Sequence, residues 1–80
     1  MEAYNPRLKK LILEVVDNQL TEGNPPITTE TFDRLIAAGY SKKTAKEKIA
    51  VAVVGQIYAI LHDGQKYDEV AYEKELKAIK

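Results

Sequence analysis

The 80-residue chain contains no cysteine, no tryptophan and a single histidine. Without cysteine it has neither disulfides nor thiolate metal ligands. The histidine, His62, has no second histidine and no group of carboxylates near it in the sequence to complete a metal shell. The pair His62-Asp63 has the residue types that orient a general base, but a cation in the last turn of a helix and a turn at Asp63-Gly64 explain it better. We therefore predict that the protein is not an enzyme and holds no metal or cofactor.

An excess of charge of either sign is also missing. Twelve basic and twelve acidic residues give a formal net charge of zero, whereas binding to a nucleic-acid backbone requires surplus positive charge on one face. The longest uncharged run has thirteen residues, fewer than the roughly 20 of a membrane span. The first residues lack the basic-then-apolar order of a secretory signal. We therefore predict a cytoplasmic protein that binds neither nucleic acid nor membrane.

The uncharged run, from Ile49 to Leu61, is the most informative feature that is present. Frequent alanine and the lack of a turn signal between residues 42 and 62 favour a helix, although the β-branched residues of 49–54 are also compatible with a strand. A helix that is apolar on all sides belongs at the centre of a domain. Gly55 costs such a helix about 1 kcal/mol relative to alanine, so we expect another helix to approach closely there.

Three glycine-containing breaks, at Gly23-Asn24-Pro25-Pro26, Gly39 and Gly64, divide the chain. The resulting prediction is an all-α fold, a compact four-helix domain spanning 1–80 with a central, largely buried third helix. The predicted helices span about 6–21, 29–38, 42–62 and 69–79.

Helix starts are indicated by capping residues. Asn5-Pro6 opens the first helix, whose apolar stripe comprises Leu8, Leu11, Ile12, Val15, Val16 and Leu20. The predicted N-caps Thr28, Ser41 and Asp68 open the other three helices. Each lies between the members of an apolar pair spaced as a hydrophobic staple; the pairs are Ile27 with Phe32, Tyr40 with Ala45, and Tyr67 with Tyr72.

Residues 35–49 resemble the helix-turn-helix of DNA-binding domains, with Gly39 in the turn and a recognition helix that begins at Ser41. This resemblance implies DNA binding by a recognition helix that carries Lys46 and Lys48. It would need a basic surface, for which the candidates are Lys42, Lys43 and Lys46, joined by Arg7, Lys9 and Lys10. Against it, the front of that helix has no arginine, asparagine or glutamine to read bases. Gly39-Tyr40 with Ala45 also resembles ubiquitin-associated domains over about fifteen residues, but a helix stop followed by a staple accounts for the same residues.

A third resemblance covers most of the chain and is to a family of small, uncharacterised bacterial helical proteins. It is carried by Asn5-Pro6, residues 14–20 (Glu-Val-Val-Asp-Asn-Gln-Leu), Pro25-Pro26, Thr28, Thr31, Arg34-Leu35, Gly39-Tyr40-Ser41, Ala45, Ile57-Tyr58, Asp68, Tyr72 and Leu76. Where that family commonly has an acid before the Ile-Tyr pair, this chain has Gln56. The resemblance implies a helical fold and no particular activity.

Asn18 and Gln19 are near the end of the first predicted helix, where we expect them to face the Pro25-Pro26 loop. Their amides can bond to the loop carbonyls, which is the interpretation that we favour. The alternative is that Asn18, Gln19, Pro25 and Pro26 contact a partner.

With no site for chemistry, the sequence favours a protein-interaction or structural module with an unknown protein partner. The apolar circumference of the third helix makes a homodimer a further possibility, and a helix-turn-helix DNA-binding protein is the alternative function.

Overall fold

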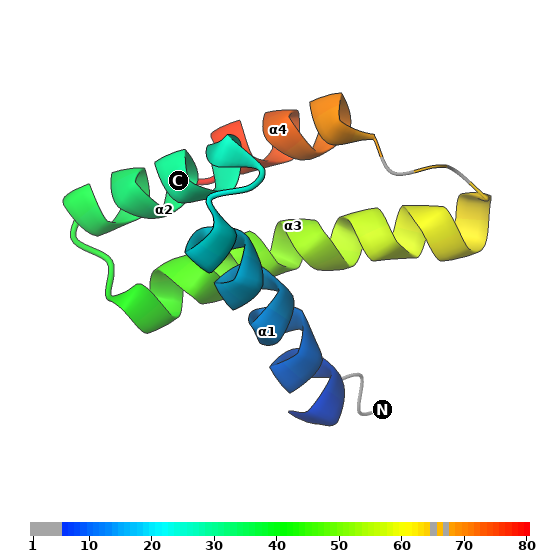
Figure 1. Cartoon of the computed structure of the whole chain (residues 1–80), viewed down its shortest axis with the longest axis horizontal. Helices are drawn as coiled ribbons and strands as arrows, with labels where there is room; N and C mark the ends of the chain where they lie inside the picture. Colours follow the sequence, from blue (N-terminus) through cyan, green and yellow to red (C-terminus); the bar gives the residue numbers. More distant parts are fainter. Residues whose placement is uncertain (1–5, 65, 67) are drawn as a thin grey trace.

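The computed structural model describes residues 6–64, 66 and 68–80. It contains α1 (Pro6–Glu22), α2 (Pro26–Ala37), α3 (Lys42–Asp63) and α4 (Glu69–Lys77), and no strand occurs in the described ranges (Figure 1). α3 is in contact with each of the other three helices. The predicted all-α fold of four helices, in which the other three contact the third, is therefore confirmed.

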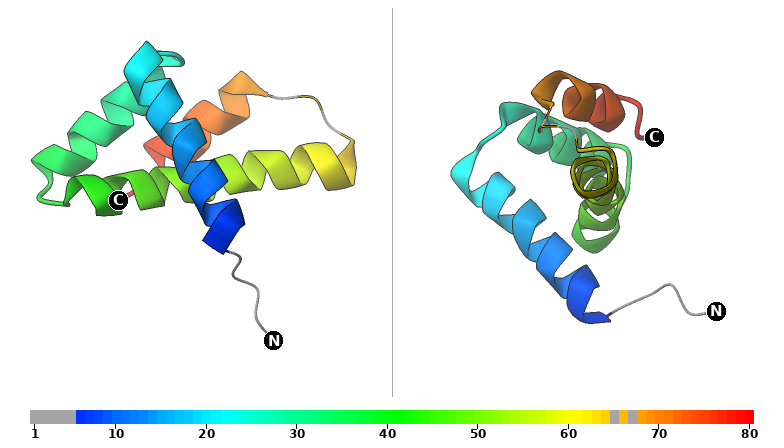
Figure 2. Two further views of the ribbon diagram at one scale, coloured as in Figure 1. Left: turned by 60° about the horizontal axis from the view of Figure 1, so that its bottom comes forward. Right: turned by 90° about the vertical axis from the view of Figure 1, so that its right-hand side faces the viewer.

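The helices cover α3 unevenly along its length. α1 crosses α3 near its middle, and the N-terminal half of α1 continues beyond the crossing (Figures 1 and 2). α2 packs on α3 and α4, and α4 packs on α3 as well. The C-terminal part of α3 extends past the crossing with α1, so fewer neighbouring helices are available to cover it.

All four helices contribute to one apolar core. Its buried members are Ile12, Val16, Ile27, Leu35, Ala45, Ile49, Ala52, Val53, Tyr72 and Leu76, and Leu20, Phe32, Ile36 and Ile79 pack against them. Four of the ten buried residues come from α3, all of them between Ala45 and Val53. The core thus lies under the first half of α3, and the prediction that this helix is central applies chiefly to that half.

The predicted caps of the last two helices are present. The Ser41 hydroxyl accepts a hydrogen bond from the backbone N–H of Thr44, and Asp68 accepts from the backbone N–H groups of Val70 and Ala71. Each side chain thereby satisfies N–H groups that have no partner within their own helix. Gly64 follows α3 with φ 65°, the left-handed conformation expected of a glycine that ends a helix. The predicted roles of Asn5 and Tyr67 fall outside the described residues.

The predicted start of the second helix is wrong by one turn. α2 begins at Pro26 with Pro25 at its N-cap, and Thr28 is a buried residue within the first turn. Proline is well suited to the first helical position, where its missing N–H has no partner to lose, so the helix starts inside the proline pair. The predicted staple across Thr28 therefore does not mark the helix start. α4 likewise ends earlier than predicted, at Lys77.

Backbone-directed polar contacts attach the end of α4 to α2. The guanidinium of Arg34 donates to the carbonyl oxygens of Leu76 (3.0 Å) and Ile79 (2.7 Å). The Tyr40 hydroxyl donates to the carbonyl oxygen of Lys80 at 3.2 Å. A helix C-terminus has carbonyls without intrahelical partners, and a cation there is favoured by both hydrogen bonding and the helix dipole. These contacts fix α4 against the α2–α3 corner.

Gly55 does not have the role predicted for it. It is exposed, and a Cβ built at this position would meet only Glu75 carboxylate oxygens, at 3.7 and 3.9 Å. These are ordinary van der Waals distances to the end of a flexible side chain. The packing of α4 on α3 therefore does not require a glycine at this position.

Candidate interaction surface

Many of the apolar side chains in the C-terminal half of α3 are exposed to solvent. Its exposed apolar residues are Val54 (46 %), Ile57 (37 %), Tyr58 (60 %), Ile60 (38 %) and Leu61 (75 %). On α1 the exposed apolar residues are Leu8 (52 %), Leu11 (53 %) and Val15 (38 %). We call these eight residues together the apolar surface. The stripe predicted on the first helix is therefore divided: Ile12 and Val16 are in the core, Leu20 packs against it, and Leu8, Leu11 and Val15 are exposed.

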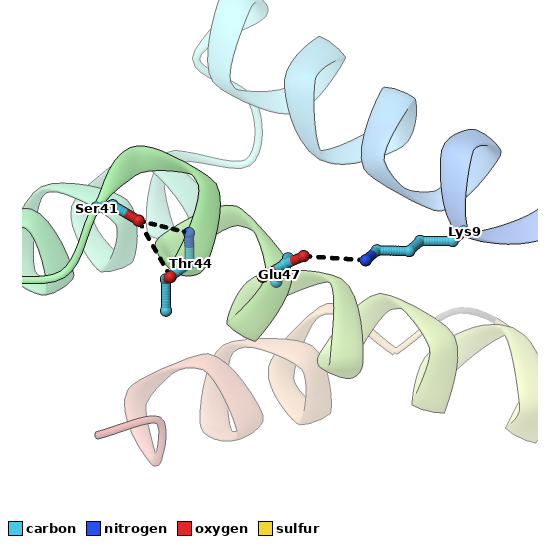
Figure 3. A network of polar contacts seen from close by, with 4 residues as sticks. All are labelled: Lys9, Ser41, Thr44 and Glu47. Carbon is cyan, nitrogen blue, oxygen red and sulfur yellow. Dashed lines mark hydrogen bonds and ion pairs between the residues drawn. The ribbon is translucent and has the colours of Figure 1, made fainter. Parts of the chain in front are cut away.

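Two ion pairs fix how α1 is rotated against α3. Lys9 Nζ lies 3.0 Å from Glu47 Oε2 (Figure 3), and Lys46 Nζ lies 2.8 Å from Asp17 Oδ1. At 100° per residue, Lys9 and Asp17 occupy one flank of α1, and the exposed Leu8, Leu11 and Val15 occupy the other. The ion pairs hold the first flank against the beginning of α3, which turns the apolar flank toward its C-terminal half.

The matching flank of α3 follows from the same helical geometry. Val54, Ile57 and Leu61 lie in the angular sector of α3 that contains Lys46 and Glu47, the two residues paired with α1. The C-terminal part of α3, to which these residues belong, extends beyond the crossing with α1 (Figure 1). The apolar flanks of α1 and α3 therefore face the same region, on the side of the crossing that lies away from α2 and α4 (Figures 1 and 2).

Gln19 has a structural role, but with partners other than those predicted. Its side-chain oxygen accepts a hydrogen bond from the Thr28 hydroxyl (2.7 Å) and one from the Tyr72 hydroxyl (2.9 Å). Thr28 and Tyr72 are both buried, so this oxygen satisfies two hydroxyls that have left water. The amide thus joins α1 to α2 and α4 instead of bonding to the carbonyls of the proline loop.

The other predicted contact residues are not brought together into one site. Asn18 is exposed on α1, three residues after Val15 and on the same flank, at the edge of the apolar surface. Pro25 is half-buried and Pro26 exposed at the start of α2. Of the four residues, only Asn18 adjoins the apolar surface. The sequence pattern alone does not locate the apolar surface, because it does not show which flank of α1 stays uncovered.

The lysines that the helix-turn-helix resemblance singled out are partly engaged within the protein. Lys46 pairs with Asp17, and the Lys48 ammonium lies 4.7 Å from the centroid of the Tyr40 ring. The Lys9 ammonium bonds to Glu47 and thereby lowers the pKa of that carboxyl below its ordinary value of 4.5; the charge of Lys43 acts in the same direction. Lys42 and Lys43 are exposed. Acidic partners thus neutralise part of the basic surface that DNA binding would need.

His62 lies in the last turn of α3, as predicted, and its ring stacks on that of Tyr58 with centroids 4.0 Å apart. Both rings are exposed, so this pair forms an edge of the apolar surface. In the part of the chain that the structure describes, no three side chains of the metal-binding types gather into a potential metal site. No helix there combines the length and apolar character that crossing a membrane demands.

Comparison of the chain with protein-family models, with curated proteins and with solved structures finds no match. The resemblance to small bacterial helical proteins therefore stays a prediction. The function has to be argued from the geometry of the apolar surface itself.

Proposed function

We propose that this domain is a protein-interaction module that binds a protein partner through the apolar surface. The observation that carries the proposal is the exposure of eight large apolar side chains on α1 and the C-terminal half of α3, six of which lie on the facing flanks of the two helices. Their exposed fractions together amount to about four whole side chains. At roughly 100–150 Å² for each fully exposed side chain, this is about 400–600 Å². The largest apolar patch on a typical monomer covers about 300–600 Å² and is often functional.

The scaffold supports such a role because the apolar surface stands on two helices whose relative position is fixed. The ion pairs of Lys9 and Lys46 and the hydrogen bonds to Gln19 orient α1 against the rest of the domain. Side chains that are ordered before binding lose less entropy when a partner arrives. Tyr58, which is 60 % exposed on α3, is one of the residue types that are enriched at the energetic centres of interfaces. The proposal includes the cytoplasmic location predicted from the sequence and assigns the protein no catalytic step.

DNA binding has weaker support. Lys46 and Lys48 both have partners within the protein, and the formal net charge of the chain is zero. We therefore expect no micromolar or tighter binding when a labelled random-sequence duplex is titrated at low salt. Binding in that range that disappears as salt rises would reverse the order of the two functions, because counterion release is the signature of phosphate contacts.

The proposal is tested by comparative capture from the lysate of the native cell, followed by mass spectrometry. The bait variant is Leu11→Gln/Tyr58→Gln/Leu61→Gln, which makes the apolar surface polar without changing the net charge. The matched control is Val70→Gln, since Val70 is 69 % exposed on α4 and lies outside the apolar surface. Helical circular dichroism and thermal melting within a few degrees of the unmodified protein establish that each bait is folded.

A partner that binds the unmodified protein and Val70→Gln but not the triple variant is the expected result. A second copy of this chain counts as such a partner. Partners that bind all three baits equally would contradict the proposal, because the apolar surface would then have no part in binding.

A further inference from the structure

We infer that the partner covering the apolar surface is a second copy of this chain, which forms a two-fold symmetric dimer. The inference rests on the proposed function, since it takes the apolar surface as the binding site and identifies its occupant. It is carried by three observations: the spacing of the exposed residues, the distribution of charge, and the exposed apolar area.

The exposed residues have the spacing of helix–helix seams. Leu8, Leu11 and Val15 are separated by three and then four residues, and Val54, Ile57 and Leu61 repeat the same separations. Alternating steps of three and four place side chains along one edge of a helix, where they interdigitate with the same pattern on a facing helix. Each chain therefore carries two short seams, and a second copy supplies two seams of matching spacing.

Charge favours a copy of the same chain as the occupant. Near a two-fold axis each charged residue approaches its own duplicate, so a self-complementary interface needs a segment with little charge. α3 has no charged residue from Ile49 to Leu61, the part that carries Val54, Ile57 and Tyr58. The chain as a whole also has a formal net charge of zero, so no overall repulsion keeps two copies apart.

The exposed area matches what a dimer requires. One partner in a stable interface of standard size buries about 800 Å², and about 65 % of a homodimer interface is apolar, which corresponds to about 520 Å² of apolar surface. The apolar surface exposes about 400–600 Å². Pairing two copies across it would therefore cover these side chains, with the stacked Tyr58 and His62 rings at one edge.

The first measurement is the molar mass by sedimentation equilibrium, from low micromolar to several hundred micromolar protein. The mass should rise from the 9.0 kDa of one chain toward twice that value. Leu61→Glu, at the most exposed position of the apolar surface (75 %), should weaken dimerisation at least tenfold. Val70→Glu places the same charge at a comparably exposed site (69 %) on α4 and should leave the dimerisation constant unchanged.

The second measurement locates the interface without altering it. In an equimolar mixture of isotopically labelled and unlabelled protein, isotope-filtered NOEs report only contacts between different chains. We expect them between the methyl groups of Leu11 on one chain and those of Val54 or Leu61 on the other, and none from Val70. A dimer whose contacts arise elsewhere, or one weakened equally by both glutamate variants, would overturn the assignment of the interface.

A mass of 9.0 kDa at every concentration, with no intermolecular NOE, would overturn the dimer. That result is distinguishable from failure of the proposed function. If the lysate experiment still recovers a different protein that binds the control and not the triple variant, the apolar surface is an interaction site with a heterologous partner. If it recovers none, both inferences fail.

Discussion

The two halves of α3 differ in composition and in burial, and the half with more charged residues is the half that contributes to the core. Residues 42–53 include five charged side chains, yet this half supplies the buried Ala45, Ile49, Ala52 and Val53. Residues 54–63 are mostly apolar, yet the one buried side chain described there is the polar Gln56. Burial therefore follows the number of helices that pack on a segment, and hydrophobicity alone does not decide it. The excess of apolar residues in the second half is what a binding surface requires.

The largest expected effect comes from placing the same charge on the buried and exposed faces of α3. Val53→Asp buries an unpaired carboxylate, a penalty of several kcal/mol, at a site that is 5 % exposed. A single core of this size supplies only about 3–5 kcal/mol, so this variant should be unfolded at 25 °C. Val51→Asp, two residues away and 72 % exposed, should melt within a few degrees of the unmodified protein. Cooperative melting of both variants at the same temperature, monitored by circular dichroism, would mean that Val53 is not in the core.

The next largest effect tests what holds the covering helices over the first half of α3. Gln19→Ala removes the side-chain oxygen that accepts from the buried Thr28 and Tyr72 hydroxyls and should lower the free energy of unfolding by about 1–3 kcal/mol. Asn18→Ala, at the exposed neighbouring position, should change it by less than about 0.5 kcal/mol. Urea denaturation of the two variants measures the difference. Equal losses would show that the amide network contributes nothing of its own.

A smaller effect of opposite sign is expected in the second half of α3. Gly55→Ala should raise the free energy of unfolding by about 1 kcal/mol, because the new Cβ meets nothing closer than 3.7 Å. Gly64→Ala is the contrasting variant, since Gly64 has φ 65° and an L side chain is strained there; it should be destabilising by about 1 kcal/mol. Thermal or urea denaturation at low protein concentration gives both values. Destabilisation by Gly55→Ala would contradict this prediction and reveal a contact within the chain that is closer than 3.7 Å.

The smallest effect concerns the ion pair that orients α1 on the first half of α3. The Lys9 ammonium lowers the pKa of Glu47, so the pair stabilises the folded state above the unfolded-state pKa of Glu47. This contribution is lost as the pH falls through the lowered folded-state pKa. Lys9→Met should therefore raise the Glu47 pKa toward its ordinary value and reduce the acid dependence of stability below about pH 5. An NMR titration of the Glu47 carboxyl in both proteins checks this, and an unchanged pKa would mean that the pair does not persist in solution.

Local rules predicted the elements of this fold well. The glycine breaks, the Ser41 and Asp68 caps and the long third helix depend on neighbours within a few residues, so the sequence contains the information directly. The start of α2 was missed because two local signals competed: the Thr28 cap and proline at the first helical position. Thr28 instead bonds to Gln19, nine residues away and on another helix. Such a bond becomes visible only when α1 and α2 are packed.

By itself, then, the sequence determined the number and type of the helices, the central place of the third, and the absence of a cysteine-based site. Helix periodicity, capping and glycine conformations are local properties, and the uncharged run can be found by inspection. The crossing of α1 over α3 was decided only in the tertiary structure, and with it the half of α3 that is buried and the flank of α1 that stays exposed. Leu8, Ile12 and Val16 belong to one apolar stripe in the sequence, yet only Ile12 and Val16 enter the core, because burial depends on which helix lies opposite a side chain.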